Sequence, residues 1–234
     1  GAGQFSWVAN AITGEDIDNK QIIEDGGFVV CTMSLGGGTA KQTVVENALK
    51  QSTELGVVYT VATGNTGQPG VNYPGNSAYV VGVGSLDNTN PLVHSSYTST
   101  GPELWVSMPG RSIQSCYLNN SYATLSGTSM ATPFAAGAVA VALSKWGNDY
   151  LYTPDQVKAY LAWCASDLET QGWDTFTGWG VEMIKSILDK NPADTPQSPG
   201  GPTDPDPENP DPTDPPAHAP RDLHFTLSGN WSMR

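Results

Sequence analysis

The chain has 234 residues, of which 38% are hydrophobic, and its formal net charge is −13. A chain of this length can bury one sizeable core. The excess of acidic residues argues against a nucleic-acid partner, because phosphate binding needs clustered Lys and Arg. The longest apolar run, residues 134–143, is shorter than the roughly 20 residues that a membrane span requires, so no membrane helix is expected.

The first part of the chain alternates short apolar runs with amphipathic stretches. This pattern predicts a helix over residues 5–23, a buried strand over 28–33, a helix over 43–55 that ends at Gly56, a buried strand over 57–62 and a short strand over 79–83. Such alternation is typical of an α/β fold with a parallel sheet and disfavours a β-sandwich.

The following part predicts strands over residues 104–107, 113–117 and 122–125, the last two paired around Asn119 and Asn120. A helix rich in small apolar residues follows directly. Thr153-Pro154-Asp155 has an N-cap residue, a proline at the first helical position and an acidic residue in the first turn, which predicts a helix to about Cys164. A turn over residues 178–181 leads to a last helix over 182–190.

The composition changes after residue 190, which predicts three parts in the chain. Residues 1–190 are expected to fold together. Residues 191–220 hold most of the 18 prolines, many in Asp-Pro steps, and are interpreted as an extended, semi-rigid linker; a proline-rich docking ligand is the alternative. Residues 221–234 are interpreted as the start of a truncated C-terminal domain. We expect the chain to be a piece of a longer protein, since it opens without an initiator Met.

The three cysteines, Cys31, Cys116 and Cys164, are too few and too widely spaced for a disulfide framework or a zinc site. At most one pair could form. Cys31 lies inside the apolar run 28–33, so a buried free thiol is expected there. Catalysis by this thiol is disfavoured, because a reactive thiolate needs an activating neighbour and no His is near in sequence.

The motif Ser-Gly-Thr-Ser-Met-Ala at residues 126–131 carries the most information about function. It places Ser129 where a glycine turn becomes a buried helix. Backbone N–H groups in a first helical turn lack intrahelical partners, and the helix dipole favours negative charge there. These are the surroundings that an attacking serine needs. A simple helix N-cap is the alternative for an isolated tripeptide of this kind.

Two further glycine-rich motifs each end a predicted strand. Residues 32–38 read Thr-Met-Ser-Leu-Gly-Gly-Gly, and residues 61–67 read Val-Ala-Thr-Gly-Asn-Thr-Gly. Ligands of an open parallel sheet collect at the carboxyl ends of its strands, so both motifs are candidate parts of one site. For Asn65 alone, a turn residue is the alternative.

Together, the three motifs resemble the subtilisin-like serine proteases, or subtilases, and the similarity extends from Gly1 to about Lys190. Supporting matches lie at residues 3–7, 73–75, 101–104, 109–110 and 178–181. The resemblance implies a three-layer α/β fold with a mostly parallel central sheet, of which the N-terminal part is missing. It implies a secreted, monomeric serine endopeptidase that acts on polypeptides. The predicted linker suggests that an accessory domain follows at the C-terminal end.

The resemblance also assigns roles to individual residues. Ser129 carries over as the nucleophile that forms the acyl-enzyme, and Asn65 donates its side-chain amide to the oxyanion beside the backbone N–H of Ser129. Two sets of substrate-binding residues also carry over. The first is an extended segment that pairs with the substrate backbone and consists of Ser34, Leu35 and Gly36. The second forms the opposite wall of a side-chain pocket and consists of Ala62, Thr63 and Gly64. Small residues on both walls favour a large apolar or aromatic guest.

The general base and its orienting acid are not found near Ser129 in the sequence. Subtilases order their triad as Asp, His, Ser. His94 lies in a loop that does not match the family's His motif, and it is interpreted as a surface residue with no carboxylate beside it. His218 and His224 lie in or beyond the linker. We therefore expect the Asp and the His upstream of Gly1.

Two other functional readings stay open at this point. One is an inactive protease scaffold that binds extended peptides along residues 34–36. The other is an acid-acting relative of the sedolisin type, which the neutral Asn65 disfavours. No metal or cofactor is expected in this chain, Glu103 being interpreted as a surface carboxylate; a structural calcium ion would belong to the missing N-terminal part.

Overall fold

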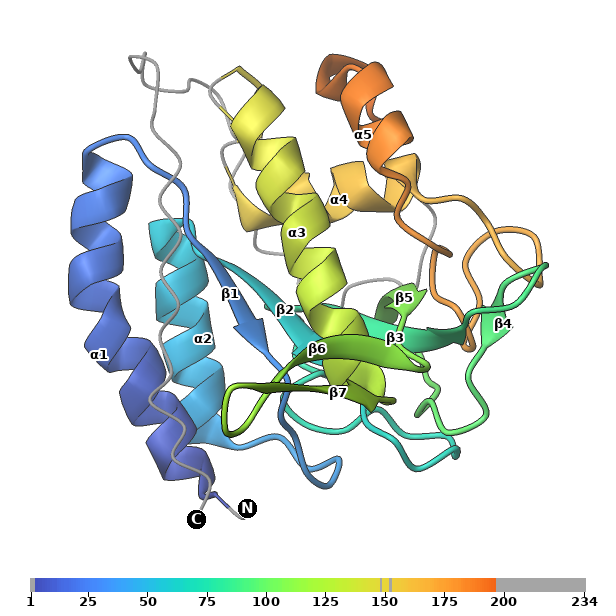
Figure 1. The fold of residues 1–234 in the computed structure, drawn as a ribbon. Coiled ribbons are helices and arrows are strands. Elements are labelled where there is room, and N and C mark those ends of the chain that lie inside the picture. The colour runs from blue at the N-terminus through green and yellow to red at the C-terminus, as the bar shows by residue number, and fades with distance from the viewer. Residues whose placement is uncertain (1–2, 148, 152, 197–234) are drawn as a thin grey trace.

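The computed structural model describes residues 3–147, 149–151 and 153–196. The expected C-terminal domain, most of the expected linker, and His218 and His224 lie outside these residues. Within them, helices cover both faces of a central sheet, as Figure 1 shows. On one face lie α1 (Phe5–Glu24) and α2 (Thr43–Leu55), and on the other lies α3 (Thr128–Trp146). The expected three-layer α/β arrangement is confirmed.

The central sheet has five strands and is mostly parallel. Strands β1 (Val30–Met33), β2 (Val58–Ala62), β3 (Val81–Asp87) and β5 (Leu104–Pro109) are parallel neighbours, with β3 between β2 and β5. The two-residue strand β4 (Val93–His94) pairs antiparallel with the end of β3. A separate hairpin is formed by β6 (Ile113–Tyr117) and β7 (Ser121–Leu125). The carboxyl ends of β1 and β2 therefore lie side by side, as the site prediction requires.

Local signals placed several element ends correctly. Gly56 ends α2 in the left-handed conformation with φ of 108°, which a residue without Cβ adopts at little cost. Helix α4 (Pro154–Cys164) begins at a capping box in which Thr153 and Gln156 bond reciprocally. Helix α5 (Ile184–Asp189) is shorter than expected, and a 3₁₀ turn, η1 (Pro192–Asp194), follows it.

The observed strands differ more from the predicted limits than the observed helices do. The strand expected over residues 79–83 is β3, which starts at Val81 and extends to Asp87, and β4 was not expected at all. The strand expected to be fully buried over residues 28–33 is β1, in which Thr32 is exposed. Within the described residues β1 pairs only with β2, so one of its edges faces outward.

Two apolar cores lie on the two faces of the sheet. One joins α1 and α2 to the sheet around Leu49 and Tyr73. The other joins α3, α4 and α5 to β3 and β5, and here α3 contributes the fully buried Ala131, Ala135 and Ala138. Small side chains on this face let α3 lie close against the sheet, which fixes the position of its N-terminal turn.

The three cysteines are free. Cys31 is only partly exposed, and burial together with the nearby carboxylates of Glu15 and Asp16 raises the pKa of its thiol to about 12. The thiol therefore stays protonated at neutral pH, consistent with the expected inert residue. None of the helices in the described part of the chain is long and apolar enough to cross a membrane.

Candidate active site

Ser129 is the second residue of α3. It is half-buried, and its backbone N–H makes no hydrogen bond within the described residues. An N–H in the first turn has no partner inside its own helix, so this group is available to a ligand. The nineteen residues of α3 align their peptide dipoles with the positive end at Ser129.

Asn65 lies directly beside this turn, held there by Thr128. The side-chain oxygen Oδ1 of Asn65 accepts hydrogen bonds from the backbone N–H of Thr128 at 2.8 Å and from its hydroxyl at 3.1 Å. The Thr128 hydroxyl in turn accepts from the backbone N–H of Gly64 at 3.3 Å. The structure thus brings Asn65 and Ser129 together from positions 64 residues apart in sequence.

The two hydrogen bonds from Thr128, here called the clamp, also define the orientation of the Asn65 carboxamide. With Oδ1 occupied by two donors, the Nδ2 group of Asn65 is the half of the amide that remains free, and it makes no hydrogen bond among the described residues. Asn65 itself is exposed. Sequence reasoning did not assign a role to Thr128, although it stands next to Ser129 in the motif.

Ser34 lies on the other side of the nucleophile. Its hydroxyl donates to the backbone carbonyl of Ser129 at 2.8 Å, and the Ser129 hydroxyl donates to the carbonyl of Ser34 at 3.4 Å. The following residues are also at the surface, Leu35 partly and Gly36 fully. This stretch therefore leaves β1 beside Ser129, where an extended chain could reach it.

The residues expected to form the opposite wall are mostly inside the protein. Ala62 is 4% exposed and Thr63 is fully buried. Thr63 donates two hydrogen bonds to the carbonyl of Val83, from its N–H at 3.1 Å and from its hydroxyl at 3.2 Å. Its side chain therefore bonds to the neighbouring strand and does not face a ligand. Gly64 is partly exposed with φ of 105°, and a Cβ there would come within 2.6 Å of Asn72. A ligand could approach this stretch through Gly64 only.

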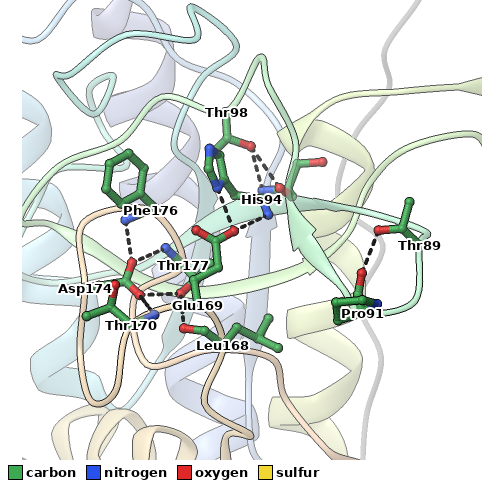
Figure 2. A network of polar contacts seen from close by, with 11 residues as sticks. Thr89, Pro91, His94, Thr98, Leu168, Glu169, Thr170, Asp174, Phe176 and Thr177 are labelled. Carbon is green, nitrogen blue, oxygen red and sulfur yellow. Dashed lines mark hydrogen bonds and ion pairs between the residues drawn. The ribbon is translucent and has the colours of Figure 1, made fainter.

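The interpretation of His94 as a loop residue without a carboxylate is wrong. His94 lies in β4, and its Nδ1 is 2.7 Å from Oε1 of Glu169, which also accepts the backbone N–H of His94 at 2.9 Å (Figure 2). The sequence did not reveal this pair because the two residues are 75 positions apart. No hydrogen bond links His94 to Ser129 or Asn65 within the described residues.

The described residues include no group of three or more His, Cys, Asp or Glu side chains that could hold a metal ion. The arrangement around Ser129 offers one hydroxyl and two N–H groups for chemistry. A helix N-terminus, a neutral amide and a serine hydroxyl together suit a reaction in which negative charge develops on an oxygen next to Ser129.

Comparison with curated proteins gives relatives of one kind. A thermostable alkaline protease of Halalkalibacterium halodurans is 35% identical over 158 residues, which cover 68% of this chain and 40% of the relative. Subtilisin E of Bacillus subtilis is 39% identical over 158 residues, covering 63% of this chain and 38% of that protein. The chain thus spans 40% or less of the length of these two relatives.

Solved structures agree with this result. A psychrophilic protease superposes with a TM-score of 0.69 at 29% identity, covering 77% of this chain and 64% of the other. A cold-adapted subtilisin-like serine proteinase superposes with a TM-score of 0.65 at 29% identity, covering 78% and 62%. The family model described as "Subtilase family" matches residues 2–180. The chain therefore belongs to the subtilase family.

Proposed function

We propose that the protein is a serine endopeptidase that cleaves polypeptides through an acyl-enzyme on Ser129. The Ser129 oxygen attacks the carbonyl carbon of the scissile bond, and its proton passes to a general base. The tetrahedral intermediate collapses, the C–N bond breaks, and the amine leaves with that proton. Water then attacks the ester by the same route and releases the second product.

The observation that carries this proposal is the double hydrogen bond from Thr128 to Oδ1 of Asn65. It leaves Nδ2 of Asn65 and the backbone N–H of Ser129 as two unoccupied donors on neighbouring residues. Donors that are already oriented stabilise a developing oxyanion without reorganising during the reaction. A protein that only bound peptides would have no need for such a pair.

We propose that the general base and its orienting carboxylate come from polypeptide upstream of Gly1, in the order Asp then His. His94 makes no hydrogen bond to Ser129 within the described residues, and the chain spans only a minor part of the relatives that it matches. The outward edge of β1 gives such a segment a place to join the sheet close to Ser34 and Ser129.

Substrate would bind as an extended strand along Ser34, Leu35 and Gly36, through main-chain hydrogen bonds. The side chain before the scissile bond would lie toward Gly64, the one residue of the 62–64 stretch that is partly exposed, and small residues on both walls favour a large apolar or aromatic group. Acyl transfer to a serine needs no metal or cofactor. We further propose that the enzyme is secreted and monomeric, with residues 191–220 joining the peptidase part to a C-terminal accessory domain.

Labelling with a serine-directed fluorophosphonate tests the proposed function. The polypeptide extended to include its upstream sequence should gain one adduct, located on the Ser129 peptide by mass spectrometry, and the Ser129→Ala variant should gain none. Binding of extended peptides without any adduct would instead support the inactive scaffold and contradict the proposal.

A further inference from the structure

A cavity of about 330 Å³ lies next to the His94–Glu169 pair. Its walls include the rings of His94 and Phe176, two prolines and two threonines: Pro69, Pro102, Thr100 and Thr175. None of these residues belongs to the set assigned to the Ser129 site. The volume is at the small end of the range for ligand pockets, which suits a single side-chain ring rather than a large cofactor.

The loop that carries Phe176 is held in place by buried polar contacts (Figure 2). Asp174 is 8% exposed, and its Oδ1 accepts the backbone N–H groups of Phe176 at 2.7 Å and Thr177 at 2.8 Å. Its Oδ2 accepts the Thr177 hydroxyl at 3.0 Å. Phe176 is nevertheless 45% exposed. The loop therefore presents an aromatic ring at the surface from a backbone that Asp174 holds in place.

The other ring of the pair, the His94 imidazole, is held by Glu169. Glu169, with φ of +58°, directs one carboxylate oxygen at both the backbone N–H and Nδ1 of His94. Nδ1 is thereby committed to Glu169, while Nε2 makes no hydrogen bond among the described residues. The imidazole and the Phe176 ring lie 5.1 Å apart, centroid to centroid, with 35° between their planes. The two rings are in tilted contact, and Nε2 of His94 is left as a polar atom without a hydrogen bond among the described residues.

The remaining walls suit a ring that also carries a polar group. Pro69 and Pro102 are exposed and contribute apolar surface. The hydroxyls of Thr100 and Thr175 make no hydrogen bond among the described residues. A planar ring can pack against the tilted His94–Phe176 pair while its hydroxyl bonds to Nε2 or to a threonine. Aliphatic side chains would fill the space without either interaction.

We propose that this cavity is a second binding site, which takes a tyrosine side chain of a polypeptide. The assignment of a polypeptide ligand rests on the proposed function, whereas the affinity for the ring does not. Gly67 contributes to the cavity and is two residues from Asn65, so their Cα atoms are within about 7 Å. A polypeptide held at Ser129 would need few further residues to reach the cavity.

The cavity is also joined to the Asn65 loop by backbone hydrogen bonds. The N–H of Gly67 donates to Tyr97 at 2.8 Å, Thr100 donates to Gln68 at 3.2 Å, and Gly70 donates to Thr100 at 2.7 Å. A ligand that contacts Thr100 therefore touches the segment that supports the residues after Asn65. The site is built on the same rigid frame as the proposed oxyanion donors.

Two-dimensional ¹H–¹⁵N NMR of the isotope-labelled 234-residue chain tests the proposal, with N-acetyl-L-tyrosinamide as the probe. We expect saturable shifts of the backbone amides of His94, Thr100 and Phe176 in the millimolar range. N-acetyl-L-leucinamide should bind roughly fivefold more weakly, because it lacks the ring. The measurement needs no catalysis, so its failure would leave the proposed function untouched, and the converse also holds.

Variants locate the binding within the cavity. Phe176→Leu keeps apolar bulk but removes the ring, and should weaken the tyrosinamide roughly fivefold while the rest of the spectrum is preserved. Tyr122→Ala, which removes an exposed ring from β7, is the matched control and should leave the affinity unchanged. Shifts confined to the residues around Ser34 and Ser129 would overturn the proposal. So would equal or tighter binding of N-acetyl-L-prolinamide, which would assign the cavity to proline-rich sequence.

Discussion

At the scale of single residues, the proposed chemistry depends on a carboxamide held by its neighbour. Thr128 is fully buried and directs both its N–H and its hydroxyl to Asn65. Its hydroxyl is also the acceptor for Gly64, so one side chain links the two residues that would face the oxyanion and the substrate. The orientation of Asn65 is therefore a property of the 126–131 motif itself.

Replacing Asn65 should remove one of the two proposed oxyanion donors. For Asn65→Leu in the catalytically complete polypeptide we expect kcat to fall about 10²- to 10³-fold, the magnitude known for this donor in subtilisin itself, with little change in KM. Steady-state hydrolysis of a peptide substrate measures both constants. A rise in KM at unchanged kcat would place Asn65 in ground-state binding instead.

Thr128→Val should have a smaller effect of the same kind. The variant keeps the backbone donor and the side-chain volume but loses the hydroxyl, which corresponds to about a tenfold loss of kcat for one hydrogen bond. Thr128→Ser retains the hydroxyl and is the matched control, with kcat expected near that of the parent. Equal losses in both variants would show that packing, rather than the hydroxyl, governs the site.

Glu182 gives a residue-scale prediction for stability. Glu182 is 5% exposed, and its two carboxyl oxygens have no hydrogen-bond partner in the described part of the chain. Burial raises the pKa of its carboxyl well above the usual range, while the positive charge of Lys190 acts to lower it. A raised pKa in the folded state means that the group's contribution to stability is fully present below the unfolded-state pKa, about 4.3, and is lost as pH rises through the folded-state pKa.

Glu182→Gln should accordingly stabilise the chain at neutral pH and leave it unchanged at about pH 3, well below the unfolded-state pKa, where the carboxyl is protonated in both states. Urea unfolding at the two pH values measures the difference. Glu54→Gln is the control, because the side chain of Glu54 is 62% exposed, and it should not stabilise the chain at neutral pH. The same stabilisation at both pH values would mean that ionisation of Glu182 is not its cause.

At the scale of elements, α3 shows how the helix that carries Ser129 is fitted to the sheet. One face is closely packed alanine, while Gly137 on another face is exposed, and a Cβ added there would meet nothing within 4 Å. Gly137→Ala should therefore stabilise the chain by about 1 kcal/mol through helix propensity. Gly82→Ala, whose Cβ would come within 2.6 Å of the Glu103 carbonyl, is the contrasting variant and should destabilise it. Thermal unfolding of both variants measures the two signs.

Elements whose limits depend on neighbouring residues could be predicted from the sequence. The end of α2 at Gly56 and the start of α4 at Thr153 were both placed correctly, because a left-handed glycine and a capping box are local. The start of β3 and the existence of β4 depend on pairing between strands, which a single sequence does not display. The burial of Thr63 was missed for the same reason.

At the site, the sequence predicted that Asn65 lies near Ser129, but it did not predict the side-chain hydrogen bonds that hold Asn65 there. Asn65 and Ser129 follow elements whose ends the α/β pattern already brings together. The clamp by Thr128 and the pairing of His94 with Glu169 depend on side-chain directions and on a loop 75 positions away. The division of the chain at residues 190 and 220 stays a prediction.

At the scale of the whole molecule, the proposed nucleophile and oxyanion donors lie on a sheet that helices cover on both faces. The proposed base is outside it. The isolated chain should thus react with a fluorophosphonate at least about 10³-fold more slowly than the longer polypeptide, since loss of a triad member removes most of the activation of the serine. Comparing the two labelling rates checks this. Equal rates, abolished by His94→Gln, would instead identify His94 as the base.

The convergence of Ser129 and Asn65 on one oxygen is the central claim, and a crystal structure of the phosphonylated longer polypeptide tests it most directly. We predict a covalent bond from the Ser129 oxygen to phosphorus, with one phosphonyl oxygen about 2.7–3.1 Å from both Nδ2 of Asn65 and the backbone N of Ser129. An adduct whose oxygens all point away from Asn65 would contradict the account.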